Sequence, residues 1–280
     1  MINKQTITVQ KVLNNNVIIA DHPIYEEVVL IGKGIGFNRK SGSLITNDAA
    51  EKTFLLRNEK ERENYVNLLP NIDEGMVDFM NDVMVHIESR MDHPLNEHIH
   101  VALTDHIAFA ISRVKKQIQF SNPFLFETES LYPKEYQVAN EIIDMIHEKF
   151  DVQFPEGETG FIALHIHSSV TDKSIKDINR HNKLIGELVD LTERTLMIEL
   201  DKQGVNYHRL VQHFHRAIER VYNVEKPSTE IRLKEMLKTE YPVCYNLAWK
   251  LIKIMQNRLN KNVDEAEIVY ITIHLHRLTL

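Results

Sequence analysis

The stretch LYPKEYQVANEIIDMIHEKFDVQFPEGETGFIALHIHS, residues 131–168, occurs a second time in this chain as EYPVCYNLAWKLIKIMQNRLNKNVDEAEIVYITIHLHR, residues 240–277. The two copies align without a gap. Matching positions are Tyr132 and Tyr241, Pro133 and Pro242, Tyr136 and Tyr245, Ala139 and Ala248, Glu158 and Glu267, His165 and His274, and His167 and His276. Two copies of a long repeat do not fit a stacked array, whose units run about 20–50 residues. The chain is therefore expected to contain two separate helical domains, each with its own core and its own histidines.

The segment before the repeat, residues 1–60, is patterned as short strands. Ile7, Val9 and Val12 precede turn-forming residues at Asn14–Asn16. The apolar run Val17–Ile19 follows that turn, and the run Glu27–Ile31 leads into the glycine-rich residues Gly32–Gly36. Such runs, divided by Asn and Gly, predict a small antiparallel sheet or barrel. A domain of about 55 residues is marginally stable alone, so we expect it to dimerise and enlarge its core.

Beyond residue 64 the hydrophobic period becomes helical. One apolar stripe is formed by Tyr207, Leu210, Val211, Phe214, Ile218 and Val221, which recur every three or four residues. The charged stretch Arg57–Asn64 fits a linker or the start of a helix, and the polar stretch Thr171–Lys183 is predicted to join the two helical modules. The fold is predicted to be multidomain α+β, with a small antiparallel β domain followed by two all-α helical bundles. The predicted domains are residues 1–60, 61–172 and 173–280.

Composition restricts the class of protein. The apolar content of 43% is enough to bury a core in each domain, and the single cysteine, Cys244, cannot form an internal disulfide. No signal peptide begins the chain, and no apolar run approaches the roughly 20 residues that cross a bilayer. We therefore expect a cytoplasmic protein without membrane insertion. The net charge is −7, yet residues 1–60 carry a small excess of Lys and Arg, which fits either contact with a polyanion or an ordinary mixed surface.

Eight of the 15 histidines form four His-x-His pairs. The pairs are His98 with His100, His165 with His167, His213 with His215, and His274 with His276. All lie in helically patterned segments, where residues i and i+2 point about 200° apart and do not face each other. There is also no HExxH motif and no second cysteine, so neither a metal site nor a cofactor is predicted.

Four histidines are poorly explained as ordinary helix residues. His165 and His274 occupy matching places on the apolar faces of the two copies, and His106 and His213 have nearly the same spacing. A titratable group on an apolar helix face costs stability. A neutral imidazole is also a good nucleophile towards a phosphoryl donor, and phosphorylation adds close to two negative charges. These four are candidate phosphorylation switches, with half-buried structural histidines as the alternative.

The glycine-rich residues Gly32–Gly36 follow the run Glu27–Ile31, and the chemistry of residues there and at the preceding turn is compatible with contact with nucleic acid, the role that the family resemblance given below implies for them. Gly32 and Gly34 allow close backbone approach, Phe37 offers a ring for stacking, Asn16 can read a base edge, and Lys33 neutralises phosphate, as does Lys11. The motif Gly-Lys-Gly-Ile-Gly is neither GxGxxG nor a P-loop, so a mononucleotide site is not expected. A simple turn joining two strands remains the alternative.

Five motifs resemble the BglG/SacY family of bacterial transcriptional antiterminators, in the right order and over essentially the whole chain. They are Val12–Asn16, Gly32–Phe37, Leu103–His106, Gly160–Ile166 and Ile271–His274. The resemblance implies a small β domain that binds RNA as a dimer, followed by two helical regulation domains of the sugar phosphotransferase system (PTS). The run LNEHIHVALTDHIAFAI is most similar to members that control glucose phosphotransferase operons.

The resemblance also implies which residues carry the function. The phosphoacceptors would be His106, His165, His213 and His274. The RNA contacts would be Lys11, Asn16, Gly32, Lys33, Gly34, Phe37 and Arg39. Lys33 stands where the β-glucoside member of the family has arginine, so a bidentate guanidinium contact is absent and the RNA preference is expected to differ.

The expected protein is a homodimeric regulator and not an enzyme. It would bind a hairpin in nascent leader mRNA and prevent the overlapping terminator from forming. By resemblance, the glucose permease (enzyme II) would phosphorylate the first regulation domain and inactivate the protein, and HPr would phosphorylate the second. The rivals are a metal enzyme that uses the His-x-His pairs, a phosphotransferase that passes phosphate onward, and a DNA-binding activator. The last would need a helix-turn-helix in residues 1–60, which are patterned as strands.

Overall fold

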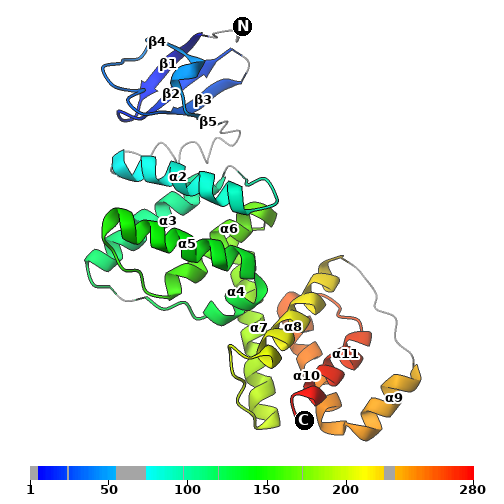
Figure 1. Ribbon diagram of the computed structural model, residues 1–280. Helices are drawn as coiled ribbons and strands as arrows, with labels where there is room; N and C mark the ends of the chain where they lie inside the picture. Colours follow the sequence, from blue (N-terminus) through cyan, green and yellow to red (C-terminus); the bar gives the residue numbers. More distant parts are fainter. Residues whose placement is uncertain are drawn as a thin grey trace. The chain divides into compact units, whose positions relative to one another are not determined.

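The computed structural model describes residues 6–23, 25–54, 74–96, 98–118, 120–171, 173–223 and 231–280. The chain divides into two compact units, Met1–Ser121 with Gln137–Asp172 and Asn122–Tyr136 with Lys173–Leu280. Strands occupy the beginning of the described chain and helices the rest (Figure 1), which confirms the predicted fold class. The predicted domain boundary at residues 60 and 61 and the charged stretch Arg57–Asn64 lie outside the described residues.

The N-terminal strands form a five-stranded antiparallel sheet. They are β1 (Thr6–Val12), β2 (Val17–His22), β3 (Glu26–Ile31), β4 (Leu44–Thr46) and β5 (Lys52–Phe54), in the order β4-β1-β2-β3-β5 (Figure 1). Strand β4 was not predicted. It has only three residues and pairs with the distant start of β1, Thr6 to Thr8, so local pattern does not reveal it.

Both faces of the central strands are buried. Ile18 and Leu30 belong to one apolar cluster, whereas their neighbours Ile19 and Val29 are also almost inaccessible. Side chains alternate between faces along a strand, so continuous apolar runs such as those in β2 and β3 are what a sheet covered on both faces requires.

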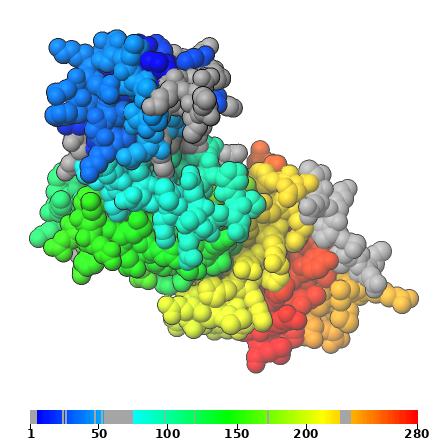
Figure 2. All heavy atoms as spheres, turned by 45° about the horizontal axis from the view of Figure 1, so that its top comes forward, coloured from blue at the N-terminus to red at the C-terminus, as the bar shows by residue number. Residues whose placement is uncertain are grey.

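The first unit contains four helices in its described residues. They are α2 (Glu74–Arg90), α3 (His98–Lys115), α5 (Pro133–Phe150, which begins within the second unit's segment) and α6 (Gly157–Thr171). The outer face of α2, cyan in Figure 2, exposes Asp82, Val85 and Glu88. Its inner face buries Val83, Met84 and other apolar side chains. The alternation of the two faces is that of an amphipathic helix.

The second unit repeats this helical order. It contains α7 (Ile175–Leu196), α8 (Val205–Asn223), α9 (Ile231–Glu240), α10 (Pro242–Leu259) and α11 (Ala266–Arg277), together with the short α4 (Leu125–Leu131). Helices α5 and α10 begin at the matching prolines of the repeat, whose fixed φ suits the first turn of a helix. The predicted stripe from Tyr207 to Ile218 is buried on α8, so its helical assignment is confirmed.

The connection between the two helical modules is shorter than the predicted join Thr171–Lys183. Helix α6 extends to Thr171, and α7 already begins at Ile175. The Ser174 side chain caps α7 by accepting a hydrogen bond of 3.1 Å from the backbone N–H of Asp177. Polar side chains dominate the first two turns of α7 because that part of the helix is mostly solvated, and its few inward residues, such as Ile178, were too sparse to indicate a helix.

Helix α4 packs against α7 and α8 within the second unit. The Ser130 hydroxyl lies 2.6 Å from His208 Nδ1, and Asn182 Nδ2 donates to Thr128 Oγ1 at 3.4 Å. Sequence order alone had placed this segment with the first helical bundle. In the described part of the chain, no helix is both long and apolar enough to span a membrane.

Candidate functional sites

Two turns of the sheet are held together by hydrogen bonds. The backbone N–H groups of Gly32 and Gly36 donate to the carbonyls of Asn16 and Asn15, at 3.0 and 2.8 Å. The N–H of Gly34 donates to the side-chain oxygen of Asn16 at 2.7 Å. Asn16 is only 7% exposed. Its amide oxygen therefore orders the glycine turn, a positioning role that the sequence did not indicate.

The glycines are needed where the two turns meet. A Cβ on Gly36 would lie 2.2 Å from the carbonyl oxygen of Asn14, which no side chain tolerates. Gly34 has φ +70°, a left-handed conformation that glycine adopts without steric cost. The close approach of the turns buries Ile35 between these glycines, whereas Lys33 before them and Phe37 after them lie at the surface.

The exposed face of this turn combines a ring and cations. Phe37 is 61% exposed, and Lys33 on the same turn and Lys11 on β1 are also exposed. Arg39 is half-buried, and its Nη1 donates to the carbonyl of Leu44 at 3.1 Å. Gly32 is buried. The structure thus places the stacking and charged candidates on an accessible surface and the candidates Asn16 and Gly32 beneath it.

The four candidate histidines come together as two pairs. In the first unit His106 on α3 and His165 on α6 have ring centroids 5.0 Å apart. In the second unit His213 on α8 and His274 on α11 are stacked, with centroids 3.2 Å apart. In each unit the two helices that carry the pair pack directly against each other (Figure 1).

The outer members of two His-x-His motifs have other neighbours. His276 stacks on Tyr241 with a centroid distance of 3.8 Å, and His215 Nε2 lies 3.8 Å from the carboxylate of Glu219. This divergence is what helical geometry predicts for residues i and i+2. Among the described residues no group of three His, Cys, Asp or Glu is arranged to hold a metal ion.

Burial favours the neutral form of three of the four histidines, His165, His213 and His274. Burial first, and then the nearby His106, lowers the pKa of His165 to about 3. Burial, followed by His213, lowers the pKa of His274 to about 4. Burial is also the main cause of the lowered pKa of His213, with Arg216 next. Near neutral pH these three rings are unprotonated, which is the nucleophilic form of imidazole.

We expect acid to destabilise the helical bundles well before carboxylates titrate. Between pH 6.5 and about 3 an unfolded His165 binds a proton that the folded residue does not, so the free energy of unfolding falls as the pH falls. Urea unfolding at pH 7 and pH 5 measures this. The His165→Gln variant should lose less stability between the two values than the wild type, whereas His93→Gln, at an exposed histidine, should match the wild type. If the free energy of unfolding changes equally with pH in all three proteins, the lowered pKa of His165 does not cause the loss of stability in acid.

An arginine and a glutamate lie beside each histidine pair, and neither was predicted from the sequence to have a function. Arg113 Nη2 donates to Glu158 in the first unit, and Arg220 donates to Glu267 in the second. The available signal was the match of the two glutamates in the repeat. The arginines supply a second signal, because each follows the first histidine of its pair by seven residues.

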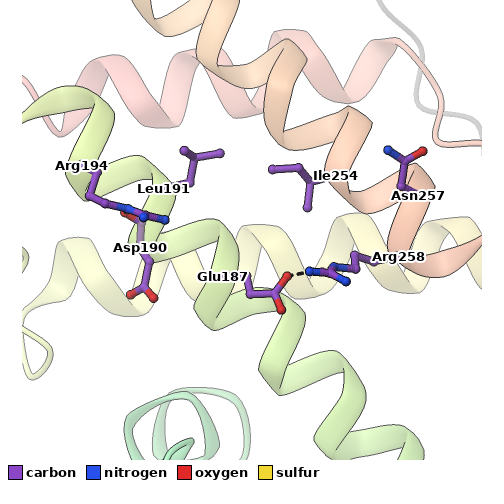
Figure 3. A pocket seen from close by; sticks show the side chains of 7 residues that line it. All are labelled: Glu187, Asp190, Leu191, Arg194, Ile254, Asn257 and Arg258. Atoms are coloured by element: carbon purple, nitrogen blue, oxygen red, sulfur yellow. Dashed lines mark hydrogen bonds and ion pairs between the residues drawn. The ribbon is translucent and has the colours of Figure 1, made fainter.

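A separate surface pocket of about 600 Å³ lies between α7 and α10 (Figure 3). Its charged walls are partly neutralised within the pocket, because Arg258 Nε donates to Glu187 at 3.0 Å, the dashed line in Figure 3. Asp190 and Arg194 add one more charge of each sign. None of the candidate site residues lines this pocket, so we do not assign it the function.

Comparison with known proteins covers both parts of the chain. Residues 7–63 match the CAT RNA binding domain, and residues 81–169 and 186–278 each match the PRD domain. A solved structure described as the crystal structure of GlcT CAT-PRDI is 58% identical, with a TM-score of 0.54. The match covers 59% of this chain and 99% of that one.

Full-length relatives agree with the domain matches. The PtsGHI operon antiterminator of Bacillus subtilis is 53% identical, with 98% of each chain covered. The GlcA/glcB genes antiterminator of Staphylococcus carnosus is 38% identical over 97% of this chain and 95% of its own. Protein GlcT of Staphylococcus aureus strain Newman is 36% identical over 96% of this chain and 95% of its own. The resemblance to a regulatory family, and not to an enzyme, is thereby confirmed. The chain belongs to the family of transcription antiterminators in which a CAT RNA-binding domain is followed by two PRD domains.

Proposed function

We propose that this protein binds a hairpin in nascent leader mRNA as a homodimer, prevents the overlapping terminator from forming, and is switched by histidine phosphorylation through the glucose phosphotransferase system. The observation that carries the proposal is the pair of adjacent, half-buried histidines on two packed helices, which recurs in each of the two helical bundles that follow the RNA-binding sheet in the chain. The proposed domains are residues 1–60, 61–172 and 173–280.

RNA recognition is assigned to the exposed face of the glycine turn. A single-stranded base can stack on Phe37, while Lys33 and Lys11 neutralise phosphates. Gly34, Gly32 and Asn16 shape the turn, and Arg39 extends the cationic surface. A hairpin with two equivalent faces suits a dimer of such sheets, and dimerisation also enlarges the core of a very small domain.

The lowered pKa values of His165, His213 and His274 support phosphorylation at the histidine pairs, because an unprotonated imidazole is nucleophilic. An unprotonated ring nitrogen attacks the phosphorus of the phosphorylated donor, the new N–P bond forms, and the bond between phosphorus and the donor side chain breaks. The electron pair of that bond stays on the donor side chain, which takes up the remaining N–H proton of the phosphorylated ring, so the transfer needs no further reagent. The product adds close to two negative charges between packed helices, which is enough to change an interface.

The proposed phosphate donors are those that the family resemblance implies. Because the relatives named above control ptsGHI and glcA/glcB genes, the donor for His106 and His165 is proposed to be the glucose permease (enzyme II). The donor for His213 and His274 is proposed to be HPr. Such a protein acts in the cytoplasm, where the nascent transcript and these carriers meet.

A terminator read-through reporter tests the proposal. The reporter carries the leader of a glucose permease gene in a strain without its own antiterminator. Read-through should require this protein and glucose, and deletion of the terminator should make expression independent of the protein. If the protein still raises expression after the terminator is deleted, it acts on the promoter, and the DNA-binding alternative is correct. The purified protein should also retard the leader hairpin and not a scrambled hairpin.

A further inference from the structure

A buried ion pair links the two histidine-bearing helices of each unit, α3 with α6 and α8 with α11. In the first, Arg113 Nη2 donates to Glu158 Oε1 at 2.6 Å. In the second, Arg220 makes a bidentate contact with Glu267, with Nε and Nη2 at 2.5 and 2.7 Å from its oxygens. Both glutamates are only 2% exposed. A carboxylate so completely removed from water depends on its cation, and removing that cation is costly.

The ion pair and the histidines form one constellation in the first unit. The carboxylate of Glu158 lies between two partners: Oε2 is 3.1 Å from His106 Nε2, and Oε1 faces Arg113. Seven residues, about two helical turns, separate His106 from Arg113 on α3, so both point from the same face of the helix. The carboxylate of Glu158 therefore separates the Arg113 guanidinium from the His106 imidazole, and it contacts both groups.

The hydrogen-bonding capacity of this constellation is incompletely used. The contact between His106 Nε2 and Glu158 Oε2 is close but lacks hydrogen-bond geometry, so among the described residues these two buried atoms and Arg113 Nε make no hydrogen bond. The rings of Phe109 and Phe120 hold the guanidinium carbon at 5.1 and 5.0 Å from their centroids. The site thus keeps an oriented arginine with a spare buried donor beside the candidate phosphoacceptors. Arginine binds phosphate through just such a planar fork of donors.

We propose that Arg113 and Arg220 are phosphate receptors, whose guanidinium groups exchange their glutamate partner for the phosphoryl oxygens once a histidine of the adjacent pair is phosphorylated. This inference rests on the proposed histidine phosphorylation. The exchange leaves Glu158 or Glu267 buried without its cation, next to a group carrying close to two negative charges. Phosphorylation thereby weakens the contact between the two helices of the pair, because their linking ion pair is lost.

The titration of the phosphoryl group tests this exchange. The full-length protein is phosphorylated with phosphoramidate, and the phosphohistidine resonances are followed by ³¹P NMR against pH. Resonances are assigned by their loss in His106→Ala, His165→Ala, His213→Ala and His274→Ala. A guanidinium bound to the phosphoryl group lowers its titration midpoint, so Arg113→Gln should raise the midpoint of the first pair by about one unit or more. The titration midpoint of Arg113→Lys should lie between those of the wild type and Arg113→Gln.

Matched variants keep the result interpretable. Arg90→Gln breaks an Arg–Glu pair on the surface of the same unit, between Arg90 and Glu141, and should titrate like the wild type. For the second pair the test is Arg220→Gln and the control is Arg258→Gln, which breaks the pair with Glu187. The double variant Arg113→Gln with Glu158→Gln leaves no unpaired buried carboxylate, so it should fold even if the single variant does not, and its midpoint should also exceed that of the wild type.

The outcomes distinguish the receptor role of the arginines from the proposed histidine phosphorylation on which it rests. A phosphohistidine signal whose midpoint is the same in the wild type, Arg113→Gln and the double variant overturns the receptor role and leaves histidine phosphorylation intact. A wild-type protein that gives no phosphohistidine at any of the four positions contradicts the proposed function itself. A raised midpoint in Arg113→Gln and the double variant, with Arg90→Gln unchanged, supports the exchange.

Discussion

Replacement of His106 by aspartate is expected to abolish antitermination whether or not glucose is present. The aspartate adds a permanent negative charge on α3, close to the buried carboxylate of Glu158, which lies 3.1 Å from the native ring. Two carboxylates then compete for Arg113, as a phosphoryl group on His106 would. Read-through should fall to the level of a strain without the protein, and sedimentation should show weakened dimerisation.

His106→Ala is expected to have the opposite effect. Alanine removes the phosphoacceptor and leaves the site without added charge, so read-through should persist in the absence of glucose. His93→Asp introduces the same charge at an exposed histidine of the same unit and should behave like the wild type. If His106→Ala is still silenced without glucose, or His106→Asp is as active and dimeric as the wild type, His106 is not part of the switch.

Phe37→Ala is expected to weaken binding of the leader hairpin about ten- to a hundredfold, because a base stack on an aromatic ring contributes about 1–3 kcal/mol. The ring is 61% exposed, so its removal takes little from the core, and stability should change only slightly. The loss then reports contact with RNA and not unfolding. Gel retardation with full-length protein at constant salt measures it.

Tyr25→Ala is the matched control for Phe37→Ala. Tyr25 is 52% exposed and precedes β3, whereas Phe37 lies beyond the other end of that strand. The control should therefore bind the hairpin like the wild type. Normal binding by Phe37→Ala, or an equal loss in both variants, would place the RNA surface elsewhere.

The repeated sequence was sufficient to predict two helical bundles. Apolar spacing in a helix is local information, so the positions of Tyr207, Phe214 and Ile218 along the chain were enough to indicate both the helix and its buried face. The apolar runs of β2 and β3 predicted strands for the same reason. By contrast, β4 depends on a partner more than 30 residues away, and α4 packs against helices that follow it much later in the chain. Local pattern carries no information about such partners.

The sequence by itself determined the domain types, their order and the four histidines that needed an explanation. Only the tertiary structure decided that His106 meets His165 and His213 meets His274, because each contact joins two helices far apart in the chain. It also decided that Asn16 lies beneath the glycine turn as its hydrogen-bond acceptor, and that Glu158 is shared by a histidine and an arginine. The physical reason is the same in each case. Residue type and spacing specify which face of an element a side chain occupies, whereas burial, pKa and partners depend on what packs against that face.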